Sequence, residues 1–171
     1  MTAPAPRAGE LLDELGRRGW SIGTAESLTG GLVAAAIVDV PGASASMRGG
    51  VVAYDTRVKR SLLGVDAALL AAHGPVHPDV ALQMARGARR ALAVDGADAD
   101  VGLATTGVAG PDQQGGIVVG TVCVAVSTPD GDRVETAAFD GDRDAIRRAA
   151  VAAVLDLAVA AIRTADRGGG E

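Results

Sequence analysis

The stretch of residues 20–38 places a short apolar segment, a turn rich in hydroxyls and glycine, and a run of small apolar residues in immediate succession. Residues 20–25 favour a strand, and residues 29–38 favour a helix packed on a sheet. Gly30 and Gly31, at the turn between them, let the backbone approach a ligand without a Cβ atom. This stretch therefore predicts a strand that leads through a potential binding turn into a helix.

The rest of the chain continues the alternation. Apolar residues at helical spacing and cap residues predict helices, short apolar runs predict strands, and the Pro-Asp-Gly-Asp turn at residues 129–132 predicts a hairpin. Helices before, between and after strands predict an α/β fold, a three-layer α/β/α sandwich whose hairpin makes the sheet mixed. The helices are expected at 9–18, 56–63, 66–72, 78–94 and 142–164, and the strands at 49–55, 99–104, 117–127 and 133–139.

Length and composition limit the domain organisation. The 171 residues fit one domain, expected at 9–165, with a disordered lead at 1–8 and a disordered tail at 166–171. Hydrophobic residues make up 48% of the chain but aromatic residues only 2%, so small aliphatic side chains must build the core. Small-residue helices and an acidic surface are compatible with a homodimer.

Charge and residue counts argue against several classes of function. A net charge of −5 and a pI near 5.0 argue against a nucleic-acid partner. The single cysteine, Cys123, excludes an internal disulfide, and with only His73 and His77 we expect no metal site and no cofactor. No apolar run reaches membrane-spanning length, and residues 1–7 lack the apolar core of a signal peptide, so we expect a cytoplasmic protein without a membrane partner.

Ser27 is a candidate nucleophile. It lies at the predicted strand-to-helix turn, where unpaired helix N–H groups favour an oxyanion or a phosphate. Backbone N–H groups near Thr29, Gly30 and Gly31 are the expected oxyanion donors. The alternative is that Ser27 or Thr29 is only a helix N-cap.

Lys59 and Tyr54 are the candidate partners of that serine. The segments 26–31, 54–59 and 105–116 each follow a predicted strand, so they can meet at one edge of the sheet. A lysine beside a hydroxyl in a dry pocket can lose its proton and act as a base, and a tyrosine can relay a proton or orient the nucleophile. The alternative for Lys59 is a solvated helix residue beside its arginine neighbours.

Two further segments could contact a ligand. Gly107 and Gly110 begin a glycine-rich loop that could wrap a ligand, although it matches neither a P-loop nor a dinucleotide fingerprint, and a mobile surface loop is the alternative. Arg143 and Arg147, at the start of the last helix, could hold a phosphate, against the alternative of a plain capped helix start. Glu26 and His77 are expected to be structural, and Cys123 to lie in the core.

Five segments, in order along the chain, resemble motifs of the CinA C-terminal domain family. The likeness extends from about Gly9 to Ile162. The first resembles the family signature TAES-C-TGG, with Leu28 in place of the cysteine, and the third resembles its S/T-G-I-A-G-P loop. The five segments are Thr24–Gly31 (TAESLTGG), Tyr54–Lys59 (YDTRVK), Thr106–Pro111 (TGVAGP), Gly120–Val122 (GTV) and Gly141–Arg143 (GDR).

The resemblance implies a nicotinamide-nucleotide amidase, which hydrolyses the carboxamide of nicotinamide mononucleotide to the acid and ammonia. It implies Ser27 as nucleophile, Tyr54 and Lys59 in proton transfer, and Thr106 and Arg143 at the substrate, a small-molecule nucleotide. The segment Gly115–Val119 departs from the family pattern because it lacks a Lys-Pro pair. A nucleotide-binding or regulatory module without activity, and an amidase for another amide of similar shape, remain the alternatives.

Overall fold

The computed structural model describes residues 6–165, so the predicted tail and most of the predicted lead lie outside the described residues. Five strands form one sheet in the order β2-β1-β3-β4-β5. Strands β1, β2 and β3 are parallel, and β4 and β5 join them as an antiparallel hairpin, which confirms the mixed sheet. The strands are β1 (Ile22–Glu26), β2 (Met47–Val52), β3 (Val101–Gly107), β4 (Thr121–Thr128) and β5 (Gly131–Ala138).

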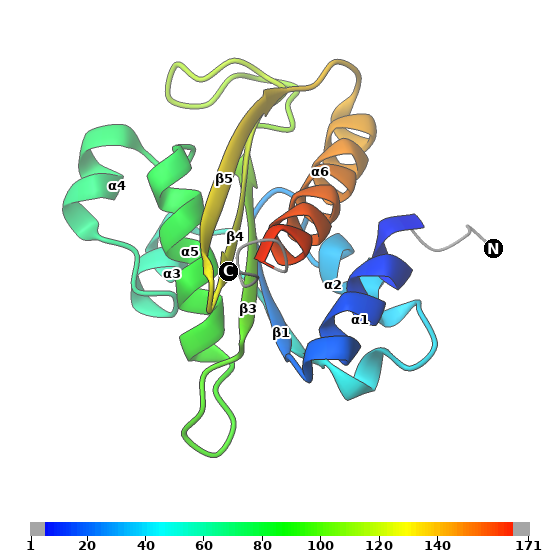
Figure 1. Cartoon of the computed structure of the whole chain (residues 1–171). Coiled ribbons are helices and arrows are strands. Elements are labelled where there is room, and N and C mark those ends of the chain that lie inside the picture. Colours follow the sequence, from blue (N-terminus) through cyan, green and yellow to red (C-terminus); the bar gives the residue numbers. More distant parts are fainter. Residues whose placement is uncertain (1–5, 166–171) are drawn as a thin grey trace.

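Helices cover both faces of the sheet, which confirms the three-layer sandwich (Figure 1). Each face has its own apolar cluster, one built around Leu15, Leu103 and Leu155 and the other around Leu63 and Met84. One face carries α1 (Pro6–Arg18), α2 (Leu32–Val38) and α6 (Arg143–Ala165), and the other carries α3 (Thr56–Ser61), α4 (Ala67–His73) and α5 (Pro78–Ala91), while a short 3-10 helix, η1 (Ala43–Ala45), precedes β2.

Helix α1 begins earlier than the sequence predicts. It starts at Pro6, so residues 6–8, assigned above to a disordered lead, are helical. Proline is well tolerated in the first turn of a helix, and Ala8 is fully buried, which anchors this turn. Arg163 of α6 also donates to the Glu14 carboxylate of α1 at 2.8 Å.

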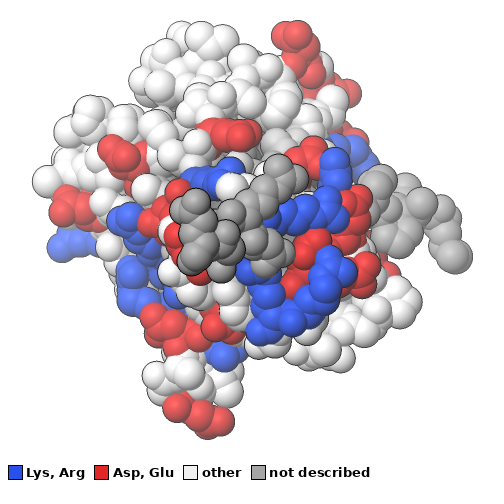
Figure 2. All heavy atoms as spheres, in the orientation of Figure 1, with Lys and Arg blue, Asp and Glu red and all other residues white. Residues whose placement is uncertain are grey.

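Acidic and basic side chains are intermixed on the face shown in Figure 2.

Small residues allow the helices to approach the sheet closely, as the composition indicates. A Cβ atom added to Gly102 of β3 would lie 2.0 Å from the carbonyl oxygen of Ala85 in α5, so no larger residue fits there. No helix within residues 6–165 is long and apolar enough to cross a bilayer.

Three predicted boundaries next to the pocket are wrong. Strand β2 ends at Val52 rather than at residue 55, where Asp55 caps α3. Helix α2 begins at Leu32 rather than residue 29, because Gly30 and Gly31 have φ angles of 58° and 103°, outside the helical region. Strand β3 continues to Gly107 rather than ending at 104, because β4 pairs with it as far as Gly107. The carboxyl ends of β1, β2 and β3 therefore lie at one edge, where α6 also begins.

Candidate active site

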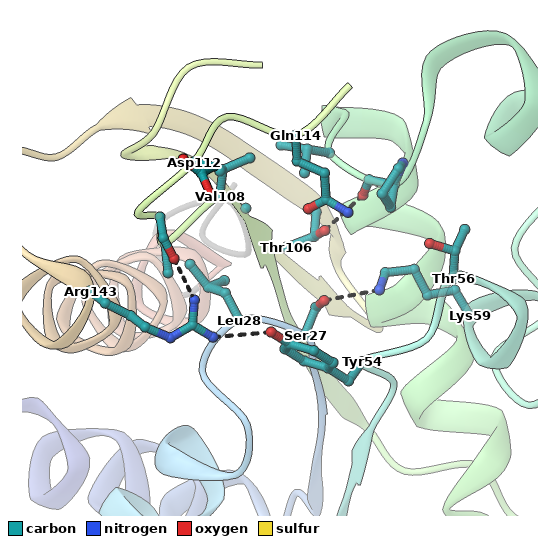
Figure 3. Close-up of a pocket in the computed structure, with 15 residues that line it drawn as sticks. Ser27, Leu28, Tyr54, Thr56, Lys59, Thr106, Val108, Asp112, Gln114 and Arg143 are labelled. Carbon is teal, nitrogen blue, oxygen red and sulfur yellow. Dashed lines mark hydrogen bonds between the residues drawn. The ribbon is translucent and has the colours of Figure 1, made fainter. Parts of the chain in front are cut away.

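Segments that follow β1, β2 and β3 line one pocket at this edge of the sheet, as predicted (Figure 3). The cavity has a volume of about 130 Å³ and opens to solvent. Seven of the ten predicted site residues line it: Ser27, Tyr54, Lys59, Thr106, Gly107, Gly110 and Arg143.

The centre of the pocket is a contact between Lys59 and Ser27. The Lys59 amine donates to Ser27 Oγ at 2.9 Å and to the Ala53 carbonyl oxygen at 2.6 Å. Lys59 is only 1% exposed, so the solvated-helix interpretation is wrong. Helix α3 carries this lysine inward because Asp55 caps its N-terminus, accepting the N–H of Arg57 at 2.8 Å.

Burial changes the protonation of this amine. Desolvation lowers the pKa of Lys59 from 10.5 to about 8, and the Asp55 carboxylate opposes part of that change. Burial, rather than repulsion by Arg57 and Arg60, explains the shift, since Arg57 pairs with Asp55 and both arginines are exposed. Lys59 is also the only lysine of the chain.

Arg143 closes the mouth of the pocket. Its guanidinium donates to the Tyr54 hydroxyl at 3.0 Å and to the Gly110 carbonyl oxygen at 2.7 Å (Figure 3). Both acceptors are neutral, and no carboxylate among the described residues pairs with this guanidinium. Asp142 caps α6 by accepting the N–H of Ala145, in agreement with the capped-start interpretation, and Arg143 lines the pocket.

Tyr54 lies beside Arg143 rather than beside Ser27. Its side chain lines the pocket but is 62% exposed. Within residues 6–165 its hydroxyl has no hydrogen bond to Ser27 or Lys59, so the expected proton relay has no direct contact here. The geometry instead couples Tyr54 to the guanidinium at the pocket mouth.

Glu26 fixes the turn that carries Ser27. It is the last residue of β1, and its carboxylate is buried, with 2% exposure. One oxygen accepts from the Thr29 hydroxyl at 2.6 Å and from the N–H groups of Gly31 and Val33 at 2.9 and 3.0 Å, and the other accepts from the Ala34 N–H at 2.9 Å. Glu26 is therefore structural, as expected. It stabilises the N-terminus of α2 directly, although it lies five to eight residues before the N–H groups that it binds.

Three predicted binding residues lie outside the pocket lining for the same reason. The expectation that Ser27 faces unpaired N–H groups of α2 is wrong, because Glu26 binds them. The Thr29 hydroxyl is shared with Thr105 Oγ1 at 2.7 Å, and the Gly30 N–H donates to the Ser27 carbonyl oxygen at 3.1 Å. Thr29, Gly30 and Gly31 thus shape the turn, and neither Ser27 nor Thr29 is the N-cap, which is Gly31.

Other predicted residues have structural partners. His77 caps α5 through Nδ1, which accepts the Asp79 N–H at 3.2 Å, and Thr106 donates to the Pro75 carbonyl oxygen at 2.7 Å. Cys123 is buried in β4 as expected, and burial raises the pKa of its thiol. No group of three or more His, Cys, Asp or Glu side chains within 6–165 is arranged to hold a metal ion.

Some pocket residues were not predicted from the sequence. Asp112 and Gln114 line the pocket from the glycine-rich loop, and their position within that loop was the only available signal. Arg147 was predicted, together with Arg143, to hold a phosphate. In the structure it donates to the carbonyl oxygens of Leu28 and Thr29.

Comparison with known proteins decides the family. The family model described as the CinA C-terminal domain matches residues 5–162. The chain belongs to the CinA C-terminal domain family. A CinA-like protein of Frankia casuarinae is 48% identical over 149 residues, which cover 87% of this chain and 33% of that protein. A putative competence-damage inducible protein of Desulforamulus reducens is 46% identical over 140 residues, or 82% of this chain and 33% of that protein.

Solved structures of the CinA superfamily share the fold. A CinA superfamily protein from Enterobacter cloacae has a TM-score of 0.87 at 28% identity, covering 95% of this chain and 94% of its own. The competence/damage inducible protein CihA from Agrobacterium tumefaciens has a TM-score of 0.81 at 33% identity, covering 95% and 99%. This chain of the CinA family spans about a third of the length of the curated relatives it matches.

The buried amine predicts a stability that depends on pH. Between pH 8 and 10.5 the unfolded lysine still binds a proton that the folded Lys59 has lost, so the free energy of unfolding should rise with pH. Relative to Lys59→Met, the wild-type protein should gain up to about 3 kcal/mol across this window, measured by urea denaturation at a series of pH values. Cys123 titrates equally in both proteins and cancels, and a difference that stays flat would show that the lysine is not desolvated.

Proposed function

We propose that this chain hydrolyses the carboxamide of nicotinamide mononucleotide to nicotinic acid mononucleotide and ammonia. The observation that carries the proposal is the buried Lys59 amine, 2.9 Å from Ser27 Oγ, with its pKa lowered to about 8. A serine beside an amine that is partly neutral near physiological pH is an activated nucleophile. The likeness of the five sequence motifs to nicotinamide-nucleotide amidases supports the substrate.

The first half of the reaction forms an acyl-enzyme. Neutral Lys59 takes the Ser27 proton, and Oγ bonds to the carboxamide carbon while the carbonyl electron pair moves to oxygen. The resulting oxyanion collapses, the carbon–nitrogen bond breaks, and the Lys59 ammonium returns its proton to the departing nitrogen, which leaves as ammonia. The Ala53 carbonyl oxygen, 2.6 Å from Nζ, keeps the amine oriented throughout.

The second half releases the acid. Water gives a proton to neutral Lys59 and attacks the acyl carbon, and the tetrahedral intermediate collapses with the Ser27 oxygen as leaving group. The lysine returns its proton to that oxygen, which restores the starting state. Every proton is thus transferred through the one amine that contacts the nucleophile.

Charged groups of both signs at the pocket suit this substrate. Arg143 offers a guanidinium whose present partners, the Tyr54 hydroxyl and the Gly110 carbonyl, are neutral, so a phosphate is the stronger acceptor. Asp112 lines the same pocket with a carboxylate, which favours a cationic ring such as a pyridinium. A mononucleotide with a positive ring and a negative phosphate complements both.

Ammonia release from nicotinamide mononucleotide by the purified chain tests the function directly. Ser27→Ala should abolish release, because no other hydroxyl lies within hydrogen-bond distance of the Lys59 amine among residues 6–165. The variant should keep the circular dichroism spectrum and the thermal midpoint close to those of the wild type. Equal ammonia release by both proteins would remove Ser27 from the mechanism.

The pH dependence of the rate tests the base. Only the neutral amine accepts the serine proton, so the rate should rise with pH through about 8 and level off above it. Lys59→Arg should be nearly inactive at every pH, because a guanidinium stays protonated. Arg60→Lys, an exchange at the exposed neighbouring position, is the matched control and should keep the wild-type profile. A wild-type rate in Lys59→Arg would rule out this lysine as the base.

Ligand binding to the inactive Ser27→Ala protein tests Arg143. In this Ser27→Ala background, the further substitution Arg143→Ala should weaken the binding of nicotinamide mononucleotide by about 10- to 100-fold, because a charge-assisted contact to phosphate is lost. Binding of bare nicotinamide should change little, since it has no phosphate. Arg148→Ala, on the same helix but paired with Asp144, is the control for calorimetric titration. Equal losses for both ligands would exclude a phosphate contact.

A nucleotide-binding module without activity is the second candidate. The segment Gly115–Val119 lacks the Lys-Pro pair of the family pattern, which is the feature that favours it. Tight binding of nicotinamide mononucleotide by the wild-type chain without ammonia release would support this candidate.

A further inference from the structure

The turn between β1 and α2, residues 27–31, bonds three of its five N–H groups within the chain. The Ser27 N–H donates to the Thr105 carbonyl oxygen at 3.0 Å, the Gly30 N–H donates to the Ser27 carbonyl oxygen, and the Gly31 N–H donates to Glu26. The N–H groups of Leu28 and Thr29 have no acceptor among residues 6–165.

These two N–H groups belong to buried residues. Leu28 is 4% exposed and Thr29 is fully buried, and buried N–H groups without an acceptor are rare in native structures. Leu28 directly follows the nucleophile and lines the pocket together with Ser27. The unused donors are therefore adjacent in sequence to the atom that attacks, where an oxyanion forms.

Arg147 holds the carbonyl groups of the same two residues. Its Nε donates to the Leu28 carbonyl oxygen at 2.9 Å and its Nη2 donates to the Thr29 carbonyl oxygen at 3.1 Å. In a planar trans peptide the C=O and N–H bonds point in opposite directions. The Leu28 carbonyl shares its peptide with the Thr29 N–H, so turning this carbonyl toward α6 directs that N–H away from α6.

We propose that Arg147 is a positioning residue that orients the Leu28–Thr29 peptide, so that the Thr29 N–H, next to the free Leu28 N–H, serves as an oxyanion donor for Ser27. This assignment rests on the proposed function, in which Ser27 is the nucleophile. It replaces the donors expected at Gly30 and Gly31, whose N–H groups are already bonded. Two arginines one turn apart on α6 then have separate tasks.

The two tasks predict different kinetic effects. Arg143 reaches the pocket mouth and affects how tightly the ligand binds, whereas Arg147 lies behind the turn and affects only the stabilisation of developing charge. A donor aimed at an oxyanion acts mainly in the transition state, so its misplacement lowers kcat with little change in KM.

The test compares Arg147→Met with Arg148→Met, a matched exchange at the next residue, whose arginine is exposed and pairs with Asp144. The first measurement is kcat and KM for ammonia release. The second is the rate at which a fluorophosphonate reagent phosphonylates Ser27. Neutral Lys59 takes the hydroxyl proton, Oγ bonds to phosphorus, the phosphorus–fluorine bond breaks to release fluoride, and the phosphoryl oxygen occupies the oxyanion position.

Arg147→Met should lower kcat and the phosphonylation rate by about 10- to 1,000-fold, with KM within about 3-fold of the wild type. The pH midpoint of phosphonylation should stay at that of the wild type, because Lys59 keeps its surroundings. Arg147→Lys, which keeps one cationic donor, should be intermediate and covers the case in which Arg147→Met does not fold. Arg148→Met should match the wild type in both measurements.

Several outcomes would overturn the proposal. These are equal phosphonylation rates for folded Arg147→Met and Arg148→Met, a loss confined to KM, or a wild-type Ser27 that does not react with the reagent. If the wild-type protein is phosphonylated at Ser27 but releases no ammonia from nicotinamide mononucleotide, the proposed substrate fails alone. The phosphonylation rates then still decide the role of Arg147.

Discussion

One buried carboxylate connects the sheet to the turn that carries Ser27. Glu26 ends β1, and its two oxygens accept from the first N–H groups of α2 and from the Thr29 hydroxyl. A buried carboxylate without such partners would be strongly unfavourable, so the chain between β1 and α2 has little freedom. The position of Ser27 follows from this constraint, because the Glu26 side chain, directly before it, binds the residues that follow it.

The same edge of the sheet contains a group that opposes folding. Burying the Lys59 amine disfavours its charged form, and the fold must compensate for this elsewhere. Two apolar clusters, packed closely through small residues such as Gly102, supply that stabilisation. A lysine on the surface keeps its ordinary pKa, so lowering the pKa requires burial. The free energy that this burial costs is offset by the packing of the core.

The sequence predicts the architecture and the place of the pocket, because strand ends that follow one another in a parallel arrangement must meet at one edge. It could not decide between a solvated and a buried Lys59, since Arg57 and Arg60 share its local pattern and only the docking of α3 separates them. Distant contacts were also out of reach. The bond between Arg143 and Tyr54 joins residues 89 positions apart.

The turn itself was only half predictable. Its hydroxyls and glycines indicate a ligand site; in the structure Ser27 lines the pocket, whereas Thr29, Gly30 and Gly31 do not. Glu26 reaches as far as eight residues ahead to Ala34, a spacing that no local capping motif describes. Side chains that close such long loops are found only when the tertiary structure is known.

Because Lys59 is the only lysine, the chain has a single side-chain amine, and that amine is enclosed. Reagents that acylate amines therefore have one side-chain target, which is only 1% exposed in the folded chain. The rate of that modification, measured by mass spectrometry, reports how often the contact between Lys59 and Ser27 opens.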